Sequence, residues 1–170
     1  MKNTLRGLVL KLAVMAFAGT AMAEDLPVPE GPVILTVSGE ISHTNIGGTA
    51  QFDLDMIEAL PQRLTLTETP WYDGVQEFSG PLLSDLMASV GAKGQELRII
   101  AVNDYAASMP LEEAQSIPVI LAVRHGGALM SVRDKGPLFV IYPFDEHPDL
   151  NNELVFSRSV WQVVEIEVMP

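Results

Sequence analysis

Hydrophobic and polar positions along the chain follow two patterns that predict strands. In three segments apolar residues alternate with small or polar ones, which is typical of strands with one buried face: residues 33–39, 64–68 and 160–168. In three others the apolar run is continuous, which is typical of strands inside a core: residues 97–102, 118–124 and 138–142. Strands are therefore the main predicted elements.

Shorter segments show helical spacing instead. Asp53 is placed to cap a helix that Pro61 ends. Residues 82–90 repeat leucine and methionine at helical intervals, and Gly91 follows as a stop. Residues 111–117, LEEAQSI, predict a short acidic helix.

Strands and short helices are thus interspersed, with more strand than helix. This mixture predicts one compact α+β domain over residues 33–170, with a mixed sheet or barrel-like core. The alternation is too irregular for a doubly wound sheet, and no glycine-rich phosphate-binding fingerprint follows any predicted strand.

Residues 1–23 have the pattern of a secretory signal peptide. Basic residues precede an apolar stretch, and Ala21-Met22-Ala23 fits the small-x-small cleavage rule. The stretch is too short to span a bilayer and no stop-transfer pattern follows, so we expect cleavage rather than an uncleaved anchor, and no stable membrane insertion. The acidic, proline-rich residues 24–32 predict a flexible lead-in to the domain.

The charge of the chain limits its partners. The formal net charge is −12, and loss of Lys2, Arg6 and Lys11 with the signal peptide leaves seven basic against 22 acidic residues, a net charge of −15. Such a surface repels phosphate backbones and anionic lipid, so we expect no nucleic-acid partner. Exposed acidic residues near the C-terminal end favour a basic partner face.

The chemistry-bearing residues give no catalytic or metal signature. The chain has no Cys, which removes disulfides, thiolate metal ligands and cysteine nucleophiles, and with the signal peptide this indicates a bacterial periplasm. His43, His125 and His147 lie far apart without metal-ligand spacing, so we expect no metal site. No serine lies in a G-x-S-x-G motif, and we assign no catalytic residue.

Five segments in one order carry a family resemblance: VSGEI, FDLDMIEALP, FSGPLLSDLM, NDYAASMPLEEA and LAVRHGGALMSVRDKGPLFVIYP. In this order the chain resembles the molybdopterin-binding oxidoreductase domain of the sulfite oxidase family over nearly all of its predicted mature length. The resemblance implies that family's fold and a cleft for a pterin cofactor.

Two positions depart from the family's pattern. Its enzymes carry a cysteine four residues before the tryptophan, where it binds molybdenum, and this chain has Thr67 there. A threonine hydroxyl is a poor ligand for such a metal at neutral pH. The family commonly has a phosphate-binding arginine where this chain has Phe139. The resemblance therefore implies a pterin cradle without its metal anchor.

Eight residues are the candidate ligand-binding set, and Thr67 is included for its position. Trp71 and Tyr72 offer flat faces for a ring, although Trp71 could equally anchor the core. Asp73 could accept paired N–H donors from an amino-pyrimidinone edge, or simply form a turn.

The other four follow buried strands or interrupt the acidic surface. Asn103 and Tyr105 come directly after the strand at 97–102, at a strand end where mixed folds carry function, although an Asx turn would explain them equally. Arg133 and Lys135 form a rare basic cluster that faces either a polar ligand or solvent.

Three functions remain open from the sequence. In the first, the chain is similar to periplasmic pterin-responsive regulators that lack the cysteine. It would bind a free pterin without catalysis and report it to the periplasmic domain of a membrane signalling protein, for example in cyclic-di-GMP control. The second is a molybdopterin-dependent oxidoreductase with a cysteine-free metal site. The third is an interaction domain with no ligand.

The cleavage site is directly testable. When the full chain is expressed with its own leader in a bacterial host, we expect the periplasmic protein to begin at Glu24, because the small residues at Ala21 and Ala23 fit the signal peptidase. N-terminal sequencing or intact-mass measurement checks this. A periplasmic product that retains Met1 would contradict it.

Overall fold

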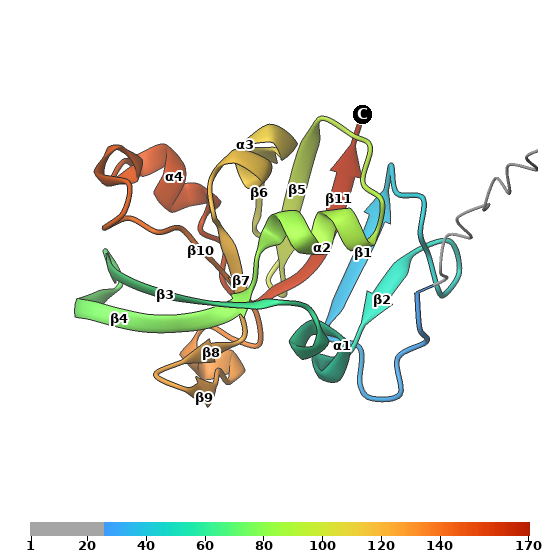
Figure 1. Ribbon diagram of the computed structural model, residues 1–170, viewed down its shortest axis with the longest axis horizontal. Helices are drawn as coiled ribbons and strands as arrows, with labels where there is room; N and C mark the ends of the chain where they lie inside the picture. The colour runs from blue at the N-terminus through green and yellow to red at the C-terminus, as the bar shows by residue number, and fades with distance from the viewer. Residues whose placement is uncertain (1–25) are drawn as a thin grey trace, which may run out of the picture.

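A computed structural model describes residues 26–170, and Figure 1 shows its elements. The predicted signal peptide, residues 1–23, lies outside the described residues. Residues 26–32 form no helix or strand, but the backbone N–H groups of Glu30 and Gly31 each donate to Asp53 Oδ2 at 2.8 Å. No helix within residues 26–170 has the length and apolar character needed to cross a bilayer.

The largest sheet has five strands in the order β2-β1-β11-β5-β6. In that order the strands are Ala50–Phe52, Leu35–Gly39, Val163–Met169, Glu96–Ala101 and Ala106–Pro110. β1 and β11 are parallel, and every other neighbouring pair is antiparallel. The predicted mixed sheet is therefore confirmed.

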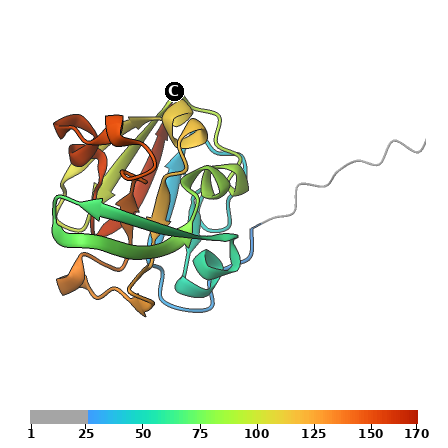
Figure 2. The ribbon, with the colours of Figure 1, turned by 60° about the vertical axis from the view of Figure 1, so that its left-hand side comes forward.

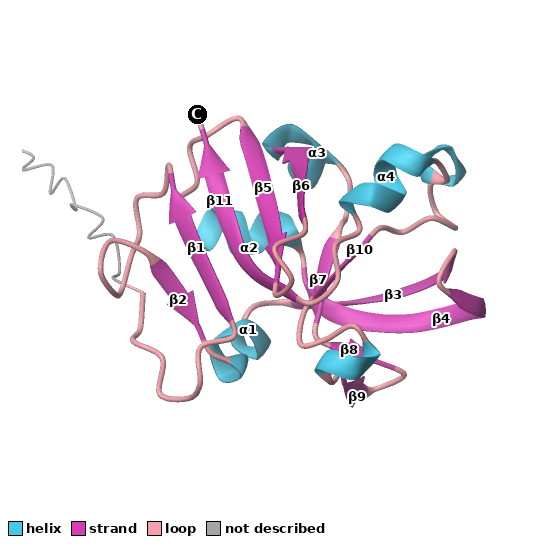
Figure 3. Ribbon diagram, turned by 180° about the vertical axis from the view of Figure 1, so that it is seen from behind, coloured by secondary structure: helices cyan, strands magenta, loops and turns pink. Residues whose placement is uncertain are grey.

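The two faces of this sheet differ as an alternating pattern requires. Val37, Ile166 and Ile99 lie side by side in register and are fully buried. The neighbouring row on the opposite face is polar, and there Ser38 lies beside Glu167. Within residues 26–170 no helix covers this polar face, and Figure 3 shows α2 and α3 behind the sheet when it is viewed from this side.

Two helices cover the apolar face. α2 (Leu83–Ser89) buries leucines and Met87, and α3 (Leu111–Ser116) buries Leu111 and Ala114. α2 ends as predicted before Gly91, whose φ of 60° suits a residue without a side chain. The predicted helix at Met56 is α1 (Leu54–Ala59).

A long hairpin of β3 (Gln62–Thr69) and β4 (Tyr72–Pro81) belongs to a second sheet, and Figure 2 shows it crossing the front of the molecule. β8 (Arg124–His125) and β9 (Ala128–Leu129) complete a four-stranded sheet in the order β3-β4-β8-β9. Near its base, a Cβ on Gly80 would lie 2.1 Å from Leu121 O, so only glycine allows this close approach.

A two-stranded sheet lies between the other two. β7 (Ile120–Ala122) pairs with β10 (Phe139–Ile141), and all six residues are buried. Phe78 of β4 packs against this pair in a second apolar cluster. The three sheets are separate in residues 26–170, so the core is layered and does not close into the barrel-like form that was the alternative prediction.

The buried face of β3 is the reverse of what its composition would favour. Thr65 and Thr67 are 1% and 0% exposed, whereas Leu64 and Leu66 are 56% and 54% exposed. Thr65 lies directly opposite the fully buried Phe78, and this register turns the threonines inward. The alternation correctly predicts a half-buried strand, but the leucines face solvent.

The segment after β10 contains a short helix that the sequence pattern did not reveal. α4 (Glu153–Arg158) is capped by Asn152, whose side chain accepts a hydrogen bond from Val155 N. Arg158 Nη1 donates to Glu113 Oε2 at 2.5 Å, and Tyr142 Oη donates to Glu113 Oε1 at 2.6 Å. One carboxylate thus ties α3, α4 and the end of β10 together.

Other differences from the prediction are local. The short strands β2 and β6 and the long strand β4 were not predicted, because their residues mix polar and apolar positions without a clear period. The predicted strand 118–124 shortens to β7. Two 3-10 turns lie in segments for which no helix or strand was predicted: η1 (Val132–Asp134) and η2 (Pro148–Leu150).

The shared carboxylate predicts a stability effect. Burial raises the pKa of Tyr142, whose hydroxyl stays protonated and donates to Glu113. Tyr142→Phe removes that donor, so we expect the free energy of unfolding to fall by about 1–3 kcal/mol. Urea denaturation measures the change. Tyr105→Phe is the matched control, because its exposed hydroxyl bond should contribute less than about 1 kcal/mol; equal losses would contradict the prediction.

Candidate functional site

Trp71 occupies the turn of the β3–β4 hairpin and is the centre of an aromatic cluster. Its ring centroid lies 5.4 Å from Phe139, 5.9 Å from Trp161, 6.2 Å from Phe156 and 6.4 Å from Phe144. Most of these pairs meet edge to face, the favoured geometry for aromatic rings. Trp71 therefore joins the hairpin to the core.

A pocket of about 310 Å³ opens beside Trp71. Its walls come from the hairpin turn, the β5–β6 turn and the segment that ends α4. They consist of Trp71, Ala101, Asn103, Tyr105, Phe156, Ser157, Ser159, Val160 and Trp161. None of these side chains carries a charge, so the pocket suits an uncharged ligand with flat apolar faces.

The β5–β6 turn holds two of the predicted residues in place. Asn103 Oδ1 accepts a hydrogen bond from Tyr105 N at 3.3 Å, which is the Asx turn considered from the sequence. Tyr105 Oη donates to Ser157 O at 2.9 Å and so links this turn to α4. Within residues 26–170, Asn103 Nδ2 has no hydrogen-bond partner, and the exposed amide can meet a ligand.

The hydroxyl groups of the two pocket serines already donate hydrogen bonds to backbone carbonyls of α4. Ser157 Oγ donates to Leu154 O at 2.6 Å, and Ser159 Oγ donates to Val155 O at 3.1 Å. Their oxygens can still accept hydrogen bonds. Polar recognition in the pocket would therefore combine the Asn103 amide with hydroxyl acceptors.

Lys135 lies near Trp161 but does not line the pocket. Its Nζ is 5.6 Å from the Trp161 ring centroid and 4.7 Å from the Tyr72 centroid, a cation–π arrangement. Tyr72 packs against His125 with ring centroids 4.7 Å apart. Burial, and secondarily the charge of Asp134, raises the pKa of Tyr72, so its hydroxyl stays protonated at neutral pH.

The eight predicted residues fall into three groups. Trp71, Asn103 and Tyr105 line the pocket, and Tyr72 and Lys135 lie next to it around Trp161. The remaining three do not line the pocket: Thr67 is buried, and Asp73 and Arg133 are exposed.

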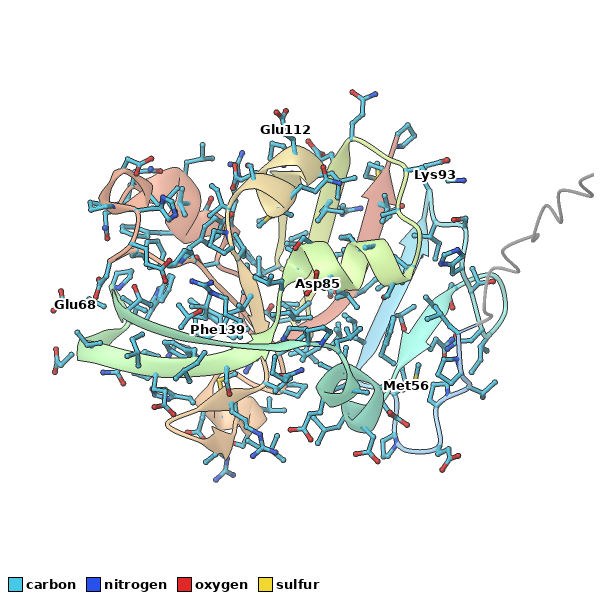
Figure 4. The ribbon with its side chains drawn as sticks, in the orientation of Figure 1. Met56, Glu68, Asp85, Lys93, Glu112 and Phe139 are labelled. Atoms are coloured by element: carbon cyan, nitrogen blue, oxygen red, sulfur yellow. The ribbon has the colours of Figure 1, made fainter. Side chains whose placement is uncertain are left out.

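Thr67 is enclosed by its own hairpin and a neighbouring loop. It is 0% exposed, its Oγ1 donates to Glu68 O at 3.1 Å, and it accepts a hydrogen bond from Asp145 N at 3.2 Å. Figure 4 shows Glu68, the next residue, at the outer end of the hairpin and Phe139 inside the molecule. The hydroxyl at position 67 is thus used for packing the loop onto β3.

These residues do not fit a molybdenum cofactor. The chain has no thiolate, and Thr67 is fully buried with its hydroxyl hydrogen-bonded to Glu68 and Asp145. Phe139 is fully buried against Trp71 where the family commonly has an arginine. Four of the five arginines in residues 26–170 already pair with glutamates, and within the same residues no group of three His, Asp or Glu is placed to hold a metal ion.

Sequence reasoning missed six of the nine lining residues: Ala101, Phe156, Ser157, Ser159, Val160 and Trp161. Phe156 and Ser157 lie on α4, and a helix of six residues is too short to show a clear helical period in the sequence. Trp161 lies in a segment predicted to be a strand, but Gln162 has a φ of 54° and β11 begins only at Val163. A tryptophan at the start of an alternating segment was the one available signal.

Comparison with known proteins supports the fold. No protein-family profile matches the chain, and no curated protein matches it. Among solved structures it is similar to the sulfane dehydrogenase SoxCD from Paracoccus pantotrophus, with a TM-score of 0.59 and 19% identity. The match covers 79% of this chain but 37% of the other. The likeness confirms the predicted α+β fold of the sulfite oxidase type, and at this identity it shows the fold alone.

The aromatic cluster predicts different costs for its two tryptophans. Trp71→Ala empties a site between four rings, so we expect the free energy of unfolding to fall by about 3 kcal/mol. Trp161 is 38% exposed, and Trp161→Ala should cost about 1 kcal/mol. Urea denaturation of both variants tests this, and a larger loss for Trp161→Ala would show that Trp71 is not the centre of the cluster.

Proposed function

We propose that this chain is a non-catalytic binding module for a small, planar, uncharged heterocycle, of which an unphosphorylated pterin is the leading example. The observation that carries the proposal is the uncharged pocket between Trp71, Trp161 and Tyr105. Its volume of about 310 Å³ is at the small end of ligand pockets, which range over about 300–1,000 Å³.

The chemistry of the walls favours a flat nitrogen ring. A ring stacked on an aromatic side chain gains about 1–3 kcal/mol. The Asn103 amide presents a donor and an acceptor of the kind that matches the edge of a heterocyclic amide. A phosphorylated cofactor would need a cation in the pocket, and no lining residue supplies one.

A second candidate function is a molybdopterin-dependent oxidoreductase, which the likeness to a sulfane dehydrogenase favours. Against it stand the enclosed Thr67 hydroxyl and the phenylalanine at position 139. We further propose that a bound heterocycle is reported to a second protein, with the periplasmic domain of a membrane signalling protein as the expected partner.

Analysis of the protein purified from its native source distinguishes the binding module from the oxidoreductase. We expect protein purified from the periplasm to release a fluorescent organic ligand on denaturation, identified by mass spectrometry. Elemental analysis should find molybdenum far below one atom per chain, because no residue anchors it. Molybdenum in near-equal amount would overturn the binding-module proposal in favour of the oxidoreductase.

The pocket itself is tested with unsubstituted pterin as the probe. Trp161→Ala should weaken binding by about tenfold or more, since a stacking face is lost, and Asn103→Ala should also weaken it. Isothermal titration calorimetry measures the dissociation constants. Asn151→Ala, an exposed asparagine outside the pocket, is the matched control and should bind as the wild type does. Unchanged affinity in both pocket variants would place the ligand elsewhere.

A further inference from the structure

The outer face of the four-stranded sheet exposes four large apolar side chains. Leu64, Leu66, Val75 and Leu129 are 56%, 54%, 58% and 49% exposed. We call these four residues the outer apolar face. Scattered exposed leucines are ordinary on a protein surface, but residues gathered on one face of one sheet indicate contact with something else.

The strand register places these residues together. Leu64 lies opposite Ser79, Ser79 opposite Arg124, and Arg124 opposite Leu129, so one row crosses all four strands on a single face. In the next row Leu66 lies opposite Glu77, and Val75 precedes Glu77 by two residues on the same side of β4. The four apolar side chains therefore share one surface.

The inverted burial of β3, with threonines inside and leucines outside, is independent evidence that this face contacts another molecule. Thr65 is buried and its Oγ1 has no hydrogen-bond partner within the described residues, whereas the adjacent leucines point outward. A shift of one residue in register would bury the leucines and expose the threonines. The polar row of the five-stranded sheet, with Ser38 and Glu167, shows the ordinary arrangement in the same chain.

The charged residues around the outer apolar face indicate what kind of molecule can bind there. Asp73 and Glu77 lie on β4 on the same side as Val75, and Glu68 is exposed at the hairpin turn. The one basic residue in the row, Arg124, is paired with Glu58 at 2.6 Å. The face is therefore apolar with an acidic border, and the chain as a whole has a net charge of −12.

From these observations we propose that the outer apolar face docks a basic amphipathic segment of a partner protein, with apolar side chains flanked by lysine or arginine. A second copy of this chain would bring the same acidic border against itself, and anionic lipid would be repelled. The face shares no residue with the pocket beside Trp71. The proposal goes beyond the heterocycle-binding function and does not rest on it.

A synthetic amphipathic peptide of leucine and lysine is the probe, and a leucine–glutamate peptide of equal length is its control. We expect the full chain to bind the first peptide and not the second in fluorescence anisotropy. Leu66→Ser and Glu77→Gln should each raise the dissociation constant by about tenfold or more, as for a central contact.

Matched variants keep the test specific. Leu154→Ser on α4 and Glu112→Gln on α3 replace equally exposed residues elsewhere, and both should bind the peptide as the wild type does. Pterin binding should be unchanged in Leu66→Ser, so failure of this proposal is distinguishable from failure of the pocket.

Several outcomes would overturn the proposal. If the leucine–lysine peptide does not bind, the face does not dock such a segment. Equal weakening by Leu66→Ser and Leu154→Ser would show that the peptide is held by general acidic attraction and not by this face. Dimers in sedimentation velocity that Leu66→Ser disperses would assign the face to a second copy. Flotation with anionic vesicles that Leu66→Ser abolishes would assign it to lipid.

Discussion

The register of the β3–β4 hairpin is the constraint on which the rest of the structure depends. Successive side chains of a strand point to opposite faces. The pairing of Thr65 with the buried Phe78 therefore determines which residues along the hairpin face the core and which face solvent. It turns Thr67 inward, where a loop encloses it, and turns Leu66 outward. It also leaves Trp71 at the turn, where its ring meets the core.

The pocket beside Trp71 is uncharged in a chain that is strongly acidic. This separation arises because the charged groups are occupied elsewhere: Arg158 is held by Glu113, and Arg124 by Glu58. Lys135 is held outside the pocket, against the rings of Tyr72 and Trp161. An apolar site with few polar groups gains affinity from stacking and depends on one or two hydrogen bonds for selectivity.

Much of the fold could be predicted from the sequence because its elements have strong periods. β1, β5 and α2 follow from alternation, a continuous apolar run and helical spacing. The facing of β3 could not be predicted, since its composition favours buried leucines and only the pairing with Phe78 reverses them.

The site was predictable only in part. Asn103 and Tyr105, which line the pocket, were predicted because residues at strand ends carry function, and Trp71 because its flat face suits a ring ligand. Trp161 was missed because the alternating residues after it hide a break in the strand at Gln162. The sequence order also gave no sign that α4 would form a wall of the pocket.

The hairpin is paired from Thr69 and Tyr72 at its turn to Gln62 and Pro81 at its base, with a register shift between Thr67 and Thr69. Its base is fixed, because Gly80 leaves no space between β4 and Leu121. Its turn is fixed as well, because the Trp71 ring lies among Phe139, Phe144, Phe156 and Trp161. The hairpin that exposes Leu64 and Leu66 on one face is thus held against the rest of the fold at both of its ends.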